Sequence, residues 1–158
     1  MRREVYRDDV ERMVDWLRDE RVTEHLNEDQ NIDRSLRRAV RLSSLPVFSA
    51  QFNRHGTFFL LTVPGRGPIG FMRLVPKDGE KAEIVVVIGE PEEWGKGYGT
   101  QAIRRGAEHV FDEWGKEELL ATIHKENDRS RRVFRKLGFS RKRDLDAEVV
   151  LALEPGDL

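Results

Sequence analysis

The segment Glu93–Thr100 reads Glu-Trp-Gly-Lys-Gly-Tyr-Gly-Thr and constrains the fold more than any other stretch of the chain. Its three alternating glycines remove side chains from a short loop, so the backbone can turn tightly and present successive N–H groups to a guest. A strand-like run over 82–88 precedes the loop, and a helix-like run over 101–114 follows it. A helix that begins here adds unpaired N–H donors and the positive end of its dipole. The sequence therefore predicts a phosphate or pyrophosphate site between a strand and a helix.

Two familiar nucleotide-binding motifs fit this loop poorly. A Walker loop needs Gly-Lys followed by Ser or Thr, whereas Lys96 is followed by Gly97. A dinucleotide fingerprint needs G-x-G-x-x-G and an acidic residue that closes the second strand. Residues 95–100 lack that spacing, and the strand predicted over 118–124 ends in His-Lys before Glu126. A nucleotide-binding module is therefore the weaker interpretation.

A second motif, Asn127–Phe139, reads Asn-Asp-Arg-Ser-Arg-Arg-Val-Phe-Arg-Lys-Leu-Gly-Phe. Together the two motifs resemble the GNAT superfamily of acyl-CoA-dependent N-acetyltransferases. The first is similar to its pyrophosphate loop (Arg or Gln, two residues, Gly, one residue, then Gly or Ala), and the second to its Asn, Ser, aromatic and Leu-Gly-Phe segment. Within the superfamily, Pro91–Thr100 and Glu126–Phe139 most resemble the branch that acetylates ribosomal-protein N-termini and related amines. One departure is that Trp94 stands at the usual Arg or Gln position.

The resemblance implies an α+β fold with three αβα layers, in which a mixed, largely antiparallel central sheet carries helices on both faces. It implies a single acetyltransferase domain over 1–158, with acetyl-CoA as the acyl donor. The expected reaction is direct transfer of the acetyl group to a primary amine, either a protein N-terminus or a small molecule, within a ternary complex. The expected assembly is a monomer or a homodimer.

Composition is compatible with these expectations. The chain has 158 residues, enough for one compact domain with a sizeable core. Its net charge of −1 provides no strong field that would select nucleic acid or a membrane surface. The absence of cysteine excludes disulfides and thiolate catalysis, and no apolar run approaches a membrane span or a signal peptide. We therefore expect a cytoplasmic protein. We expect no metal site, because the histidines at 25, 55 and 109 show no ligand spacing.

The periodicity of the chain predicts the following elements. A first helix follows Asp8, with Glu11 closing a capping box, and a second helix runs from Asp33 to Pro46. Three strands over 57–63, 69–75 and 81–88 form an antiparallel meander because short turns join them. After the helix over 101–114 come a strand over 118–124, a helix over 128–137 and closing strands over 139–145 and 147–153.

By resemblance, the strand end before the glycine loop pairs with the pantetheine amides, the loop binds the pyrophosphate, and the second motif borders the sulfur end of the cofactor. The Lys96 side chain could contact a phosphate or face water. The Asn127 side chain could contact the pantetheine arm or cap the following helix, and the two roles are compatible. The predicted cofactor-binding residues are Val87, Ile88, Gly89, Gly95, Lys96, Gly97, Tyr98, Gly99, Thr100, Asn127, Ser130 and Phe134.

The candidate catalytic residues are Glu83 and His124. Glu83 interrupts an apolar strand, so it is either a general base beside a cleft or the solvated start of the strand. Histidine can exchange protons near neutral pH, but His124 could equally lie at the surface. A backbone N–H near Ile88 or Gly89 is expected to polarise the thioester carbonyl. Phe134 stands where many relatives have the tyrosine that protonates the leaving thiolate.

The sequence leaves the acceptor and one rival function open. An acidic rim (Glu20, Glu24, Glu28 and Asp29) would suit a cationic amine, whereas the arginines of the second predicted helix would suit an acidic peptide or an RNA-bound protein. The rival function is a module of the same fold that binds CoA without turnover.

Overall fold

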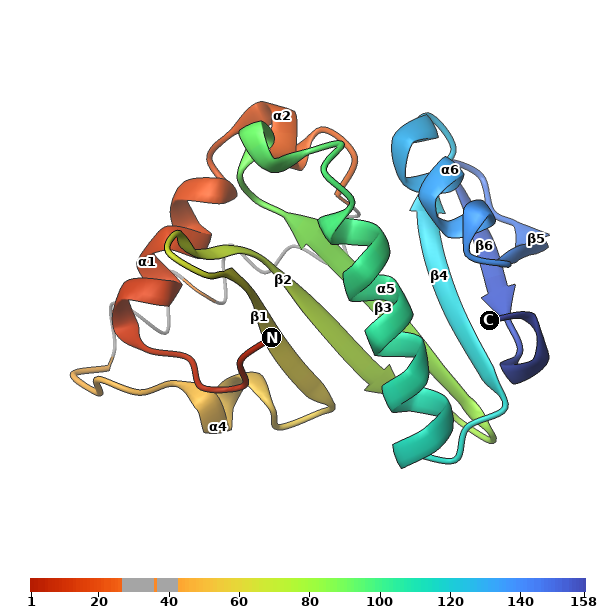
Figure 1. Cartoon of the computed structure of the whole chain (residues 1–158), viewed down its shortest axis with the longest axis horizontal. Coiled ribbons are helices and arrows are strands. Elements are labelled where there is room, and N and C mark those ends of the chain that lie inside the picture. Colours follow the sequence, from red (N-terminus) through yellow and green to blue (C-terminus); the bar gives the residue numbers. More distant parts are fainter. Residues whose placement is uncertain (27–35, 37–42) are drawn as a thin grey trace.

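Alternation of apolar side chains along the central strands builds two cores, one on each face of a sheet. The computed structural model describes residues 1–26, 36 and 43–158. In the first strand, Phe58 and Leu60 enter one core, while Phe59 and Leu61 enter the other. Helices cover both faces, so the structure confirms the expected three-layer α+β arrangement (Figure 1).

The sheet has six strands in the order β1-β2-β3-β4-β6-β5, and every neighbouring pair is antiparallel except β3 and β4. The strands are β1 (Thr57–Val63), β2 (Gly67–Pro76), β3 (Lys81–Ile88), β4 (Glu118–His124), β5 (Ser140–Asp144) and β6 (Glu148–Leu153). The predicted meander corresponds to β1, β2 and β3.

The parallel pair β3–β4 is short. It contains three residue pairs, from Lys81 with Glu118 to Glu83 with Leu120. Beyond them, β3 continues to Ile88 along its antiparallel partner β2, while β4 follows β6. The two strands therefore separate toward their carboxyl ends, which Figure 1 shows as a widening gap in the middle of the sheet.

The helices pack on the two cores. α1 (Arg7–Trp16) packs on one face, and α5 (Tyr98–Glu108) and α6 (Asp128–Lys136) pack on the other. The shorter elements are α2 (Glu20–Thr23), α4 (Ser49–Phe52), the 3₁₀ turns η2 (Pro91–Glu93) and η4 (Pro155–Asp157), and a π turn η3 (His109–Glu113) that continues α5. None of the described helices is long and apolar enough to cross a membrane.

Three predicted boundaries differ from the structure or lie outside it. The expected cap at Asp8 was wrong: Tyr6 caps α1, and its N–H donates to Asp9 Oδ2 at 2.8 Å, because Asp9 is the residue that lies buried against Arg2. α5 begins at Tyr98, within the glycine loop, since Gly97 takes a left-handed conformation and serves as its cap. The helix predicted over 33–46 falls mostly outside the described residues.

Trp16, the last residue of α1, fixes this helix against the end of β3. Its indole lies against Gly89, where a Cβ atom would overlap the ring, and its Nε1 donates to Glu90 Oε1 at 2.8 Å. Because Trp16 is almost fully buried, the ring cannot move aside without disturbing the core. Gly89 is therefore required for the close approach of α1 to the strand.

We expect Gly89→Ala to lower the free energy of unfolding by about 1–3 kcal/mol, because the added methyl group overpacks the contact with Trp16. Gly156→Ala is the control, since a Cβ atom there meets no neighbour. Urea unfolding of both variants checks the prediction, and equal stabilities would contradict it.

Candidate active site

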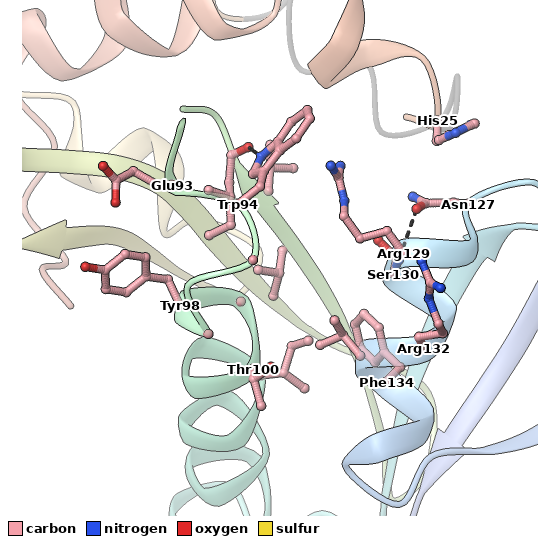
Figure 2. Close-up of a pocket in the computed structure, with 18 of the residues that line it drawn as sticks. His25, Glu93, Trp94, Tyr98, Thr100, Asn127, Arg129, Ser130, Arg132 and Phe134 are labelled. Carbon is pink, nitrogen blue, oxygen red and sulfur yellow. Dashed lines mark hydrogen bonds between the residues drawn. The ribbon is translucent and has the colours of Figure 1, made fainter. Parts of the chain in front are cut away.

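A cleft of about 400 Å³ opens where β3 and β4 have separated. Figure 2 shows its two walls: the strand end with the glycine loop and α5 on one side, and α6 on the other. Its lining residues come from four places: 21–26 near α2, the end of β3, the loop with the first turn of α5, and α6. The cleft is therefore bordered by both sequence motifs.

The glycine loop presents the N-terminus of α5 to this cleft. The first helical bond of α5 runs from Gln101 N–H to the Gly97 carbonyl at 3.0 Å, so the amides of residues 98–100 precede it and have no partner within the helix. Gly95 and Gly97 have positive φ angles of 76° and 87°, and a Cβ atom at either would meet nothing within 4 Å. The loop is thus left-handed backbone beside open space, which suits an anion.

Glu93 holds the loop by its side chain and also lines the cleft. It is buried, with 5% of its surface exposed, and it accepts hydrogen bonds from Arg66 in the β1–β2 turn and from Lys96 Nζ at 3.1 Å. Lys96 does not line the cleft, because its ammonium group is held by Glu93. The only cation of the loop is therefore engaged within the protein.

The end of β3 offers one backbone donor to the cleft. Gly89 N–H donates to the Ile69 carbonyl at 2.8 Å, on the side of β2. Because backbone groups alternate along a strand, the Ile88 N–H and carbonyl point to the opposite side, toward the cleft. Trp94 Nε1 donates to that carbonyl at 2.9 Å, which agrees with this orientation. Of the two predicted N–H groups, Ile88 faces the cleft and Gly89 does not.

Asn127 and the first turns of α6 form the second wall. Asn127 caps the helix, and its Oδ1 accepts from Ser130 N–H at 3.1 Å (dashed in Figure 2). Ser130 also lines the cleft, and Phe134 closes its inner end, where it packs edge-on against Phe139 with ring centroids 4.9 Å apart. The capping interpretation of Asn127 is correct, and its amide nitrogen has no hydrogen-bond partner within the described part of the chain.

Trp94 and Arg129 meet across the outer part of the cleft. The Arg129 guanidinium carbon lies 3.6 Å from the centroid of the Trp94 ring, which is within cation–π range. Partial burial of this guanidinium lowers the pKa of Arg129, and the nearby Glu24 carboxylate opposes that effect. The sequence marked Trp94 only as a departure from the family pattern and did not single out Arg129 as a site residue.

Glu83 lies on the face of the sheet opposite α5 and α6. Its Oε2 is 2.7 Å from Lys77 Nζ, and its Oε1 accepts from Thr122 Oγ1 at 3.0 Å. The side chain is 19% exposed and does not line the cleft. The carboxylate therefore bridges β3 and β4 at the point where the two strands begin to separate.

His124 lies on the same face, two residues beyond Thr122 along β4. Its ring stacks on His25 with centroids 5.7 Å apart, and its Nδ1 accepts a long hydrogen bond from Glu126 N–H at 3.3 Å. His25 lines the cleft, and its Nδ1 has no hydrogen-bond partner in the described part of the chain. The histidine pair thus connects the end of β4 to the segment after α2.

The structure gathers most of the predicted cofactor residues. Those that line the cleft are Val87, Ile88, Gly95, Gly97, Tyr98, Gly99, Thr100, Asn127, Ser130 and Phe134; Gly89 and Lys96 do not. Lining residues that sequence reasoning missed include Arg21, Val22, His25, Leu26, Arg129, Arg132 and Lys136. Within residues 1–26, 36 and 43–158, no three His, Asp or Glu side chains form a group that could hold a metal ion.

Helix N-terminal amides next to an open strand edge suit a ligand that carries both phosphates and amides, as acyl-CoA does. The chain belongs to the GNAT acetyltransferase family, because the sequence profile of the acetyltransferase (GNAT) domain matches residues 3–140. A search of curated proteins found no match.

Solved structures share the fold at low sequence identity. An acetyltransferase of the GNAT family from Bacillus anthracis is 21% identical, with a TM-score of 0.71 over 93% of this chain and 89% of that chain. Spermidine N-acetyltransferase from Vibrio cholerae, solved in complex with CoA and spermine, is 13% identical, with a TM-score of 0.71 over 98% of this chain and 95% of that chain. A domain from Methanocaldococcus jannaschii is 18% identical, with a TM-score of 0.71 over 96% and 95% of the two chains.

We expect Asn127→Ala to lower the free energy of unfolding by about 1 kcal/mol, because the first turn of α6 loses its cap. Asn127→Asp keeps an acceptor at the same place and should retain most of that stability. Thermal unfolding without ligand compares the two, and a loss of similar size in both variants would show that capping is not the source.

Proposed function

We propose that this chain is an acetyl-CoA-dependent N-acetyltransferase that acts on a primary amine, with residues 1–158 forming one catalytic domain. The carrying observation is the cleft that joins the amides of the α5 N-terminus to the cleft-facing backbone of Ile88. Acetyl-CoA supplies an acetyl thioester, and transfer of the acetyl group to the amine forms an amide and releases the thiol of CoA.

The cleft residues suit the parts of this donor. The amides of residues 98–100 and the Thr100 hydroxyl are donors for a pyrophosphate. The Asn127 side chain and the cleft-facing edge of β3 at Val86 and Ile88 suit the pantetheine amides. The Ile88 N–H is the donor best directed to polarise a thioester carbonyl. Backbone groups perform most of these tasks, so substitution of side chains would leave most of the hydrogen-bond donors for acetyl-CoA in place.

The amine would approach from the other face of the sheet. α1 covers that face, and Glu83, Thr122 and His124 lie on it where β3 and β4 have begun to separate. A protonated amine must lose a proton before it can attack a carbonyl carbon. We assign the proton-accepting role to Glu83, directly or through a water molecule, and keep His124 as the alternative.

The acceptor is a protein N-terminus or a small-molecule amine. The similarity of the two motifs to the ribosomal-protein branch supports the first, and the fold shared with spermidine N-acetyltransferase supports the second. A panel of both kinds of amine, with detection of released CoA thiol, distinguishes them.

A module that binds CoA without turnover is the second candidate. Phe134 favours it, because its ring carries no proton for a departing thiolate at the inner end of the cleft. A CoA thiolate can leave without an acid, so Phe134 is also compatible with catalysis. Binding of acetyl-CoA without thiol release from any amine would support the module.

Acetyl-CoA should bind in the micromolar range typical of enzyme substrates, and Gly97→Ala should weaken that binding about tenfold or more. The methyl group would enter the open space beside the amides and strain a left-handed residue. Gly79→Ala carries a similar strain (φ 69°) in a distant turn and should leave affinity unchanged. Calorimetry measures both, and equal affinities would place the phosphates elsewhere.

Glu83→Gln should reduce turnover roughly a hundredfold or more with little change in acetyl-CoA affinity, since it keeps an acceptor for Thr122 but removes basicity. Lys77→Gln, which removes the ionic partner but not the carboxylate, is the control. An unchanged turnover in Glu83→Gln would exclude Glu83 as the base.

A further inference from the structure

The phosphates of acetyl-CoA bring several negative charges to a loop that has no free cation. Backbone amides can hold phosphate oxygens, but they carry only partial positive charge. Lys96 is held by Glu93 at 3.1 Å and lies outside the cleft lining. Position 94, where the family usually has Arg or Gln, is a tryptophan. A cation for the phosphates must therefore come from elsewhere.

The opposite wall carries such cations. Arg129, Arg132 and Lys136 are spaced i, i+3 and i+7 on α6, so they share one side of the helix, and all three line the cleft. The neighbouring basic residues are different: Arg135 is exposed and does not line the cleft, and Arg131 donates to the Lys125 carbonyl and to Asp128. Positive charge on this helix is thus selectively directed to the cleft.

Arg129 is the member of this set that the structure holds next to the glycine loop. Its guanidinium stacks on Trp94, directly before Gly95, and the indole N–H is fixed to the Ile88 carbonyl at 2.9 Å. Figure 2 shows the Arg129 side chain reaching from α6 toward Trp94 on the loop side. Within the described residues, no carboxylate forms an ion pair with Arg129. Stacking uses the flat face of a guanidinium and leaves the N–H donors on its edge available.

We propose that Arg129, held in place by Trp94, binds the pyrophosphate of acetyl-CoA and supplies from across the cleft the positive charge that the glycine loop lacks. The inference rests on the proposed function, because it takes acetyl-CoA as the occupant of the cleft. It gives Trp94 a definite role: the aromatic ring positions a cation that the opposite wall of the cleft supplies. The cofactor would then be bound by both walls, with amides from α5 and a guanidinium from α6.

Calorimetric titration with CoA and with dephospho-CoA, which lacks the 3′-phosphate, tests the proposal. Arg129→Gln should weaken binding of both ligands by about tenfold or more, as expected for loss of a hydrogen bond between charged groups. Arg129→Lys should be intermediate, because an ammonium keeps the charge but lacks the planar fork. Arg135→Gln, an exposed position on the same helix outside the cleft, should match the wild type.

Substitutions at position 94 test the positioning step. Trp94→Leu should weaken CoA binding, and Trp94→Phe should weaken it less because a ring remains for stacking. In the double variant Trp94→Leu/Arg129→Gln, the loss should be smaller than the product of the single losses, since both act on one contact. The unfolding midpoints of all variants show that each is folded.

Three results would overturn the proposal. A loss in Arg129→Gln that appears with CoA but not with dephospho-CoA would assign Arg129 to the 3′-phosphate. Unchanged affinity for both ligands, with a raised KM for the amine, would assign it to the acceptor. If the losses of CoA affinity multiply in the double variant, Arg129 and Trp94 act on CoA binding independently. Failure of the wild-type protein to bind CoA at all would instead contradict the proposed function.

Discussion

The separation of β3 from β4 is the constraint on which the rest of the site depends. Two parallel strands that paired along their whole length would use every backbone group between them and leave no opening. Here the pairing ends at Glu83, so the later part of β3 keeps backbone groups directed to the gap. The glycine loop and α6 can then occupy the two sides of the opening. The cleft is thus produced by the sheet, and the helices complete it.

This arrangement also distributes the candidate site residues over the two faces of the sheet. The glycine loop, α5 and α6 border the cleft from one face of the sheet, while Glu83 and His124 lie on the α1 face, which His25 connects to the cleft. Ligands that enter from opposite faces can meet in the gap without competing for the same entrance. Such a geometry suits a direct reaction between two bound molecules, because it places both before any bond forms.

Local signals were sufficient to predict the six strands and the helices α1, α5 and α6, since alternation, glycines and short turns act within a few residues, but the one-turn helices α2 and α4 were not predicted. The strand over 118–124 and the helix after Asn127 were predicted almost to the residue. Contacts between distant segments were not predictable in the same way. Nothing in the spacing indicates that Arg129 meets Trp94. Lys96 was expected to face either a phosphate or water, and its pairing with Glu93 was not anticipated. The cap at Asp8 failed for a similar reason, because a contact with Arg2 selected Asp9 instead.

The buried carboxylate of Glu93 has a consequence for how this family member can vary. A lone negative charge beside the proposed phosphate site would repel the ligand and would itself be costly to bury. Arg66 and Lys96 neutralise it, so a change at position 66, in a turn between two other strands, would alter the field at the loop without touching the ligand. Positions 66, 93 and 96 therefore form one electrostatic unit. In related sequences, we expect these three residues to be retained or replaced together.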